Sequence, residues 1–462
     1  MKRISLTLFF LVSLLYCQAQ DITGTWYGRL VQFDLRLVFH ISEKDGSYQT
    51  LLDSPDQHSN GITTGSTTFD GTHLTIEIPK LNAQYKGDYA NGEIKGTFTQ
   101  HNLPFPLDLS RQETIRKRPQ EPKPPFPYHT EDLTFENPAA GITLAGTLTL
   151  PQKEGKFPAV ALISGSGPQD RNEELMGHKP FLVIADYLTR QGIAVLRFDD
   201  RGFGKSGGQF SGATSQDFAT DVQAAVNYLK TRKEIQSNRI GLVGHSEGGM
   251  IAPMVAANDS QIAFIVLLAG VGTKGHDLLV TQAITLTKAA GGGKEEIRTV
   301  GAVQREAGRI VIDYPVQEAA SKLDSLYKKT FETSPGNESL TPEAKQKYIR
   351  QAIAKITDPW TRYFIAYDPA PVLAKVKCPV LALNGEKDLQ VVAHENLEGI
   401  RNALQKSGNQ KVKTVSFPGL NHLFQECKTG VIAEYAEIEQ TFSPEVLKVM
   451  GDWIKEQTQK KK

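Results

Sequence analysis

One serine of this chain stands in a setting that could make it a nucleophile. Ser246 lies in Gly244-His-Ser-Glu-Gly248, a Gly-x-Ser-x-Gly pattern, with the apolar run Ile240–Val243 before it and the helix-compatible run Gly249–Ala257 after it. A sharp strand-to-helix turn brings neighbouring backbone so close that only glycine fits on either side of the serine. The pattern therefore predicts Ser246 at a helix N-terminus, whose partial positive charge stabilises a developing oxyanion.

A second serine matches the same pattern. Ser206 lies in Gly204-Lys-Ser-Gly-Gly208, but the apolar run before it ends several residues earlier and no helical pattern begins until about Ser215. The overlapping Gly202-Phe-Gly-Lys-Ser-Gly207 also fits Gly-x-Gly-x-x-Gly, with Asp221 downstream. A dinucleotide site needs those glycines to open a helix directly. We therefore predict that Ser206 lies in a loop and that the chain uses no such cofactor.

A serine hydroxyl needs a base to take its proton, and the base needs a carboxylate to fix its tautomer. Two later apolar runs each end close to a candidate: Val380–Leu383 precedes Asp388, and Lys411–Phe417 precedes His422. The chain order Ser, Asp, His is typical of one class of strand–helix enzymes. We predict that Asp388 orients His422 and that His422 activates Ser246.

Other residues could fill these roles. Glu386 could replace Asp388 as the orienting acid. His394 could replace His422, although the pattern places His394 in the helix after the acid loop. His245, next to the nucleophile, cannot turn back to serve it and is predicted to pack or hydrogen-bond locally.

The oxyanion needs two backbone N–H groups. One belongs to the residue after the nucleophile, Glu247, and the other to the loop after the first central strand, Ser164–Asn172. In that loop we assign the donor to Ser166, with Gly165 as the nearest competitor. The side chain of Glu247 is expected to place a favourable negative charge in the first helical turn.

The elements that must position these residues alternate between apolar strands and amphipathic helices, such as Ser215–Arg232, whose apolar residues recur at helical spacing. From about Thr273 to Pro371 the strand signal disappears, with interruptions at 291–293 and 334–336. We predict a helical cap there, over the carboxyl edge of the sheet; a peripheral appendage is the alternative. The predicted buried strands are Phe157–Ile163, Ile193–Phe198, Ile240–Val243, Ile262–Leu268 and Val380–Leu383.

The N-terminal part has a different pattern. Residues 21–112 alternate in short runs such as His73–Ile78, separated by Asp-Gly and Asn-Gly turn pairs, and predict an all-β domain. Its Gly24-Thr-Trp-Tyr-Gly28 resembles the start of a lipocalin-like small barrel; a spacing module without a ligand is the alternative. The prolines in residues 113–127 predict a semi-rigid linker, which leaves 128–462 as the catalytic domain.

Residues 1–20 predict a secretory signal peptide. A basic start and a short apolar run up to Leu15 precede small and polar residues up to Gln20. The run falls short of the roughly 20 residues that a spanning helix needs, so we expect cleavage, a secreted or periplasmic protein and no membrane span in the mature form. Cys17 leaves a lipoprotein as an alternative. Tyr16 argues against it, because lipid-attachment sequences usually carry a small residue at that position.

Composition excludes some partners. A net charge of +1 and a pI near 7.7 give no field that would attract nucleic acid or an anionic membrane. After cleavage only Cys378 and Cys427 remain, and a disulfide between them is permitted but not implied. Neither cysteine lies in a motif that activates a thiol.

From about Tyr128 to the C-terminus the chain resembles a bacterial α/β-hydrolase family, the esterase EstD-like carboxylesterases, related at greater distance to serine aminopeptidases. The resemblance implies an α/β-hydrolase fold with the triad at Ser246, Asp388 and His422. It implies a carboxylic ester hydrolase that forms an acyl-enzyme on small, short-chain esters, without a cofactor or a metal. A peptidase or amidase is the alternative within enzymes, and a non-catalytic binding protein acting through the β domain is the alternative outside them. One departure is Ser164, where many relatives have histidine. The motifs are Gly165–Arg171, Asp199–Ser206, Gly244–Gly249, Asn384–Val391 and Gly419–Gln425.

Overall fold

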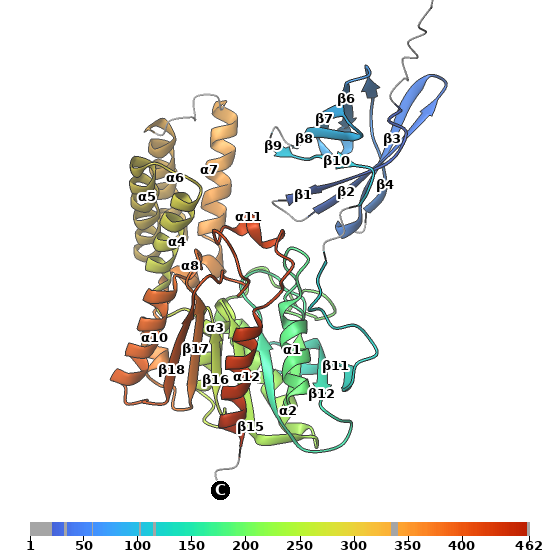
Figure 1. Ribbon diagram of the computed structural model, residues 1–462. Helices are drawn as coiled ribbons and strands as arrows, with labels where there is room; N and C mark the ends of the chain where they lie inside the picture. The colour runs from blue at the N-terminus through green and yellow to red at the C-terminus, as the bar shows by residue number, and fades with distance from the viewer. Residues whose placement is uncertain are drawn as a thin grey trace, which may run out of the picture. The chain divides into compact units, whose positions relative to one another are not determined.

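The computed structural model describes residues 21–31, 35–57, 59–100, 103–113, 117–333 and 341–459. The chain forms two compact units, Met1–Arg116 and Lys117–Lys462 (Figure 1). The predicted signal peptide with Cys17 and the predicted interruption at 334–336 lie outside the described residues.

The first unit is a closed antiparallel β-barrel. Eight strands follow one another in the order β10-β1-β2-β3-β5-β6-β7-β8, and β8 pairs with β10 to close the ring. The predicted small all-β barrel is therefore confirmed, and Leu74, Ile76 and Ile78 of the alternating run all lie in its core. The ring strands are β1 (Gly24–Leu30), β2 (Leu35–Lys44), β3 (Ser47–Ser54), β5 (Thr67–Phe69), β6 (His73–Ile78), β7 (Ala83–Ala90), β8 (Glu93–Gln100) and β10 (Leu109–Ser110). Two further strands, β4 (Ser59–Thr63) and β9 (Leu103–Pro106), pair with β3 and β8.

The second unit contains an eight-stranded sheet in the order β11-β12-β14-β13-β15-β16-β17-β18. The six strands β13 to β18 run parallel to their neighbours in this group, as the continuous apolar runs predict. The sequence analysis did not identify the antiparallel strands β11 and β12 at one edge. The strands are β11 (His129–Asn137), β12 (Ile142–Leu150), β13 (Phe157–Ile163), β14 (Ala194–Phe198), β15 (Ile235–His245), β16 (Ile265–Leu268), β17 (Val380–Gly385) and β18 (Val412–Phe417).

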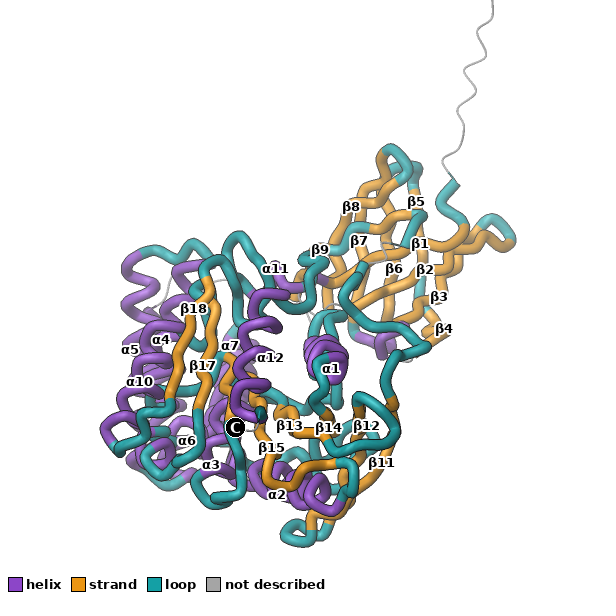
Figure 2. Tube along the Cα trace, turned by 60° about the horizontal axis from the view of Figure 1, so that its bottom comes forward, coloured by secondary structure: helices purple, strands orange, loops and turns teal. Residues whose placement is uncertain are grey.

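Helices cover both faces of this sheet (Figure 2). Along β13, Ala159, Ala161 and Ile163 pack against one set of helices, whereas Val160 and Leu162 pack against the other. Successive strand residues point to opposite faces, so a strand that is buried on both faces must be apolar throughout. One face carries α2 (Ser215–Thr231), α3 (Glu247–Ala256) and α10 (Ala393–Lys406), and the other α1 (Pro180–Arg190) and α12 (Pro444–Thr458).

The chain reverses its winding direction at β13. After β13 it forms β14 on one side and then returns to form β15 on the other. A crevice opens outside the carboxyl ends of the strands at such a switch point, and ligands bind there. The loops after β13 and β15 carry the predicted oxyanion residues and Ser246.

A helical insertion separates β16 from β17, as predicted from the loss of strand signal between 273 and 371. Its described residues include no strand, and it has a small core of its own around Ile310, Leu323 and Ile356. We call this insertion the cap. Its helices are α4 (Gly275–Ala289), α5 (Lys294–Asp313), α6 (Val316–Thr333), α7 (Pro342–Ile356), α8 (Pro359–Ala366) and α9 (Ala370–Leu373).

The proline-rich segment is fixed to the second unit from residue 117 onward. The Arg118 guanidinium donates to the carbonyl oxygens of Met176, Gly177, Ala436 and Ile438 at 2.8 to 3.1 Å. Beside it, Gln120 bonds the backbone of residues 441–442, in the segment that follows His422 and includes α11 (Ile432–Tyr435). This part of the predicted linker is therefore a strap across two loops of the sheet unit.

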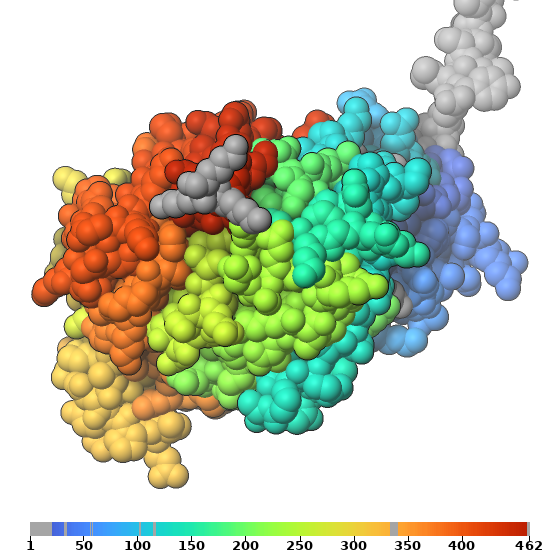
Figure 3. All heavy atoms as spheres, turned by 90° about the horizontal axis from the view of Figure 1, so that it is seen from below, coloured from blue at the N-terminus to red at the C-terminus, as the bar shows by residue number. Residues whose placement is uncertain are grey.

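A separate hollow lies at the end of the sheet opposite the carboxyl ends of the strands. It lies where residues 237–263 meet residues 375–411, on the face shown in Figure 3. No predicted catalytic residue lines it. Cys378, at its wall, and Cys427 are both free cysteines. None of the helices in the described ranges is long and apolar enough to cross a membrane.

Candidate active site

Ser246 occupies the sharp turn between β15 and α3. Its backbone has φ 53° and ψ −114°, a conformation that costs a non-glycine residue energy and persists only where the surroundings enforce it. Its N–H donates to Leu268 O at 2.8 Å. A Cβ on Gly244 would lie 2.0 Å from Gly248 O, and one on Gly248 would lie 2.1 Å from Ile163 O. The two glycines of the pattern are thus required by the close approach of backbone.

Asp388 and His422 meet on neighbouring loops after β17 and β18. His422 Nδ1 lies 2.7 Å from Asp388 Oδ2, and both residues are buried. The other carboxylate oxygen, Oδ1, accepts the backbone N–H groups of Gln390 and Val391 at 2.8 and 2.9 Å. The carboxylate is therefore held on both oxygens, and it can fix the tautomer of the imidazole and leave Nε2 for chemistry.

The alternative residues lie elsewhere. Glu386 is exposed and accepts a hydrogen bond from Ser416 Oγ at 2.8 Å. His394 lies in α10 with 86% of its side chain exposed, near Glu398. The structure brings Asp388, and not Glu386, to His422.

The nucleophile turn and the histidine loop are joined directly. His245, the residue before Ser246, has Nε2 3.0 Å from His422 O, and the two imidazole rings lie 4.8 Å apart. Within the described residues no hydrogen bond joins Ser246 Oγ to the His422 ring. Catalytic hydrogen bonds of a free enzyme often tighten only when substrate is bound.

The two predicted oxyanion donors face no protein acceptor. In the described part of the chain, neither Ser166 N nor Glu247 N has a hydrogen-bond partner. The competitor, Gly165, donates its N–H to Glu173 Oε1 at 2.6 Å. Gly165 is therefore already engaged, and Ser166 is the better candidate for an oxyanion.

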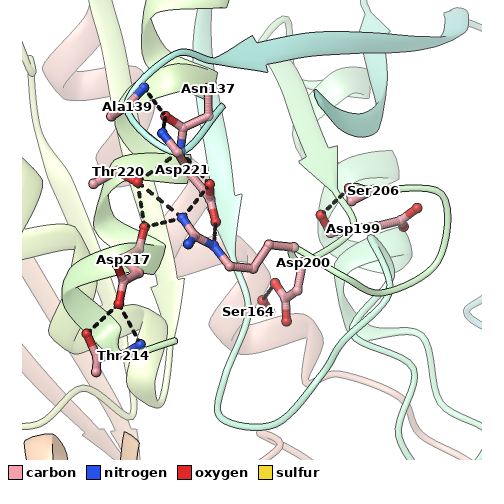
Figure 4. A network of polar contacts seen from close by, with 12 residues as sticks. Asn137, Ala139, Ser164, Asp199, Asp200, Ser206, Thr214, Asp217, Thr220 and Asp221 are labelled. Carbon is pink, nitrogen blue, oxygen red and sulfur yellow. Dashed lines mark hydrogen bonds and ion pairs between the residues drawn. The ribbon is translucent and has the colours of Figure 1, made fainter. Parts of the chain in front are cut away.

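Asp200 forms the floor beneath the oxyanion loop. It accepts hydrogen bonds from Ser164 Oγ at 2.7 Å and from Gln169 N at 2.9 Å (Figure 4). Burial raises its pKa to about 8, and the nearby carboxylates of Glu247 and Glu173 add to that effect. Ser164 thus holds this acid at the start of the oxyanion loop.

Ser206, the serine of the rival motif, has a structural role in the loop after β14. Ser206 Oγ donates to Asp199 O at 2.7 Å and accepts from Ala145 N at 2.9 Å (Figure 4). The acid that suggested a nucleotide site, Asp221, is paired with Arg201 at 2.7 Å. The Ser206 hydroxyl and the Asp221 carboxylate therefore both have partners inside the protein.

The Glu247 side chain links the nucleophile turn to the cap. Its Oε1 accepts from Ser215 Oγ at 2.5 Å and from the indole N–H of Trp360, in α8, at 2.7 Å. Burial raises the pKa of Glu247 to about 7. The expectation of a simple negative charge at the helix N-terminus therefore misses both the burial and the contact with the cap.

The sequence analysis did not identify Glu173. This buried residue has φ 52° and accepts hydrogen bonds from Gly165 N and, at 2.9 Å, from His245 Nδ1. Its only signal in the sequence is an acid in the loop that carries the oxyanion residues. No cluster of three or more His, Cys, Asp or Glu within the described ranges is arranged to hold a metal ion.

Comparisons with known proteins show which family the chain is similar to. A family model described as serine aminopeptidase, S33, matches residues 179–426. Esterase EstD of Thermotoga maritima is 27% identical over 300 residues, 64% of this chain and 62% of that protein. Protein PA2218 of Pseudomonas aeruginosa is 31% identical over 155 residues, 32% of this chain and 40% of that protein. The chain thus spans less than two thirds of the length of either relative. Among solved structures, α/β hydrolase GrgF from Penicillium sp. sh18 has a TM-score of 0.44 at 18% identity, covering 71% of this chain and 99% of that one.

Proposed function

The chain belongs to the serine aminopeptidase S33 family of hydrolases, and from that premise we propose that it is a carboxylesterase acting through Ser246, His422 and Asp388. The observation that carries the proposal is the buried Asp388–His422 hydrogen bond, on loops joined to the strained turn of Ser246. Esterase EstD, similar over 300 residues, supports the choice of an ester as substrate.

In the proposed reaction Ser246 Oγ attacks the ester carbonyl carbon while His422 Nε2 takes its proton. Asp388 holds the imidazole and stabilises its charged form. The N–H groups of Ser166 and Glu247 bind the oxyanion. The carbonyl re-forms as His422 protonates the departing alcohol, and water, activated by the same base, then releases the acid and frees Ser246.

The carboxylates near the serine favour an ester over an aminopeptidase substrate. An aminopeptidase must bind the α-ammonium of its substrate, and a carboxylate is the usual partner for such a cation. Among the described residues the buried acids around Ser246 all have internal partners: Glu173 bonds His245, Asp200 bonds Ser164, and Glu247 bonds Ser215 and Trp360. The second candidate is a peptidase or amidase, which the family's description favours.

A panel of 4-nitrophenyl esters of graded acyl length, assayed beside aminoacyl anilides, separates these candidates. We expect ester turnover to exceed anilide turnover, with a preference for short acyl chains. Faster turnover of the anilides would reject the esterase and favour the second candidate.

Labelling with a fluorophosphonate tests the nucleophile. The wild type should be labelled, and Ser246→Ala should abolish labelling. Ser206→Ala is the matched control, because it removes the serine of the rival motif and should still be labelled. An unlabelled wild type would favour a binding protein that acts through the β-barrel.

A further inference from the structure

A buried acid and a buried histidine lie directly behind the predicted catalytic residues. Glu173 is 4% exposed and His245 is 6% exposed, and Oε1 of the first lies 2.9 Å from Nδ1 of the second. Three loops of the site meet at this contact. Glu173 holds the N–H of Gly165 in the oxyanion loop, His245 precedes Ser246, and its Nε2 bonds the carbonyl of His422.

The partners of His245 define its charge. A neutral imidazole has one N–H donor and one acceptor nitrogen, whereas imidazolium has two donors. Nδ1 faces a carboxylate oxygen and Nε2 faces a carbonyl oxygen, and both of these are acceptors. Beside an ionised Glu173, only the charged ring satisfies both contacts. Burial works against that charge, but the charge and hydrogen bond of Glu173, the His422 carbonyl and the charge of Asp388 together outweigh burial and raise the pKa of His245.

We infer that Glu173 and His245 form a charged positioning pair that fixes the oxyanion loop and the catalytic histidine for ester hydrolysis. The inference rests on the proposed function, because it assigns the pair a role in that reaction. Neither residue is given contact with the substrate; each acts through a neighbour, Gly165 or His422.

The pair affects the reaction through geometry. The oxyanion N–H groups and the base must be in place before charge develops, and a displacement near 1 Å can cost about 100-fold in rate. The His245 ring lies 4.8 Å from the His422 ring and its Nε2 bonds the His422 carbonyl, so a displaced His245 displaces the base. The other titratable groups around the two rings are Asp388 and the phenol of Tyr435.

The variant Glu173→Gln tests the pair in the full-length protein. Glutamine keeps the size of the side chain and an oxygen for Gly165 N, but it removes the charge that holds His245 protonated. We expect kcat to fall about 10- to 100-fold while KM changes less than about threefold.

His178→Gln is the matched control for loss of stability alone. His178 is also fully buried and also joins loops, with Nδ1 3.0 Å from Thr441 Oγ1 and Nε2 2.9 Å from Tyr435 O. Here a hydroxyl can donate, so a neutral ring satisfies both contacts. This variant should lower the melting temperature, with kcat within about threefold of the wild type.

The outcomes separate the inference from the proposed function. A wild type that neither reacts with the fluorophosphonate nor cleaves esters refutes the proposed function. A labelled wild type, with Glu173→Gln equal to it in kcat, refutes the positioning pair alone.

Nitrogen-15 NMR of the wild-type histidines measures the protonation of the His245 ring. This test does not depend on the folding of a variant. His245 should show two protonated ring nitrogens at pH 7, above the ordinary pKa of a histidine. A neutral His245 at pH 7 would overturn the inference.

Discussion

Replacing Glu247 by glutamine isolates the effect of a buried carboxyl group on stability. Glu247 is 2% exposed, and burial raises its pKa from 4.5 to about 7, even though the hydrogen bonds from Ser215 and Trp360 act to lower it. Glutamine keeps an oxygen that can accept both bonds, and it does not titrate. The substitution therefore removes the proton equilibrium and leaves the contacts in place.

The sign of the effect follows from which state binds the proton. Between pH 4.5 and about 7 the folded protein holds a proton on Glu247 that the unfolded chain has released, so the free energy of unfolding of the wild type falls as pH rises through this window. The loss is complete above about pH 7. The interval between the two pKa values corresponds to about 3 kcal/mol. We therefore expect Glu247→Gln to gain about 3 kcal/mol relative to the wild type between pH 4.5 and pH 8.

Urea unfolding of both proteins at pH 5, 6, 7 and 8, followed by tryptophan fluorescence, measures this difference. The Glu247 carboxylate helps to raise the pKa of Asp200 to about 8, so Asp200 titrates differently in the two proteins near pH 8, and the comparison relies on the points from pH 5 to pH 7. Glu386→Gln is the matched control, because it makes the same chemical change at an exposed glutamate. A difference between Glu247→Gln and wild type that stays constant with pH, or shrinks toward pH 7, would refute the reasoning.

Three further substitutions test the site and its support. Asp388→Asn keeps an oxygen for the two backbone bonds but disturbs the His422 tautomer, so kcat measured with esters should fall about 1,000- to 10,000-fold with little change in melting temperature. Gly248→Ala would drive a Cβ against Ile163 O and should abolish fluorophosphonate labelling, whereas Gly293→Ala, with open space around it, should be labelled normally. Arg118→Ala leaves four carbonyl oxygens without their donor and should cost about 3 kcal/mol in urea unfolding; a loss below about 1 kcal/mol would show that the strap contributes little.

The sequence predicts the parts of the site that depend on local pattern. The turn at Ser246 needs an apolar strand, small flanking residues and a helix, and these lie within twenty residues of one another. Asp388 and His422 follow the neighbouring strands β17 and β18, and parallel strands bring their carboxyl ends to one edge of the sheet, so their meeting follows from the order of the strands. The cap could be located for a similar reason, because a hundred residues without strand signal must leave the sheet.

The remaining parts of the site depend on contacts between segments that lie far apart in the sequence and share no periodic pattern. Glu173 lies 72 residues before His245, and Glu247 lies 113 residues before Trp360. A single acid in a loop is ordinarily solvated, and only the packed structure shows that these two are buried. Similarly, β11 and β12 lie at the sheet edge, where β11 is half-exposed and lacks the continuous apolar run that marks a central strand.

One residue connects the cap to the predicted oxyanion site. The main-chain N–H of Glu247 is the predicted oxyanion donor, and its side chain bonds the indole of Trp360 in the cap. Both groups belong to the first turn of α3, so a movement of α8 relative to α3 must stretch or break the bond to Glu247. Breaking it would leave a buried carboxyl with only Ser215 as its partner, which costs about 1 to 3 kcal/mol. That cost favours the attached position of α8, and it makes the cap part of the structure that holds the predicted oxyanion donor in place.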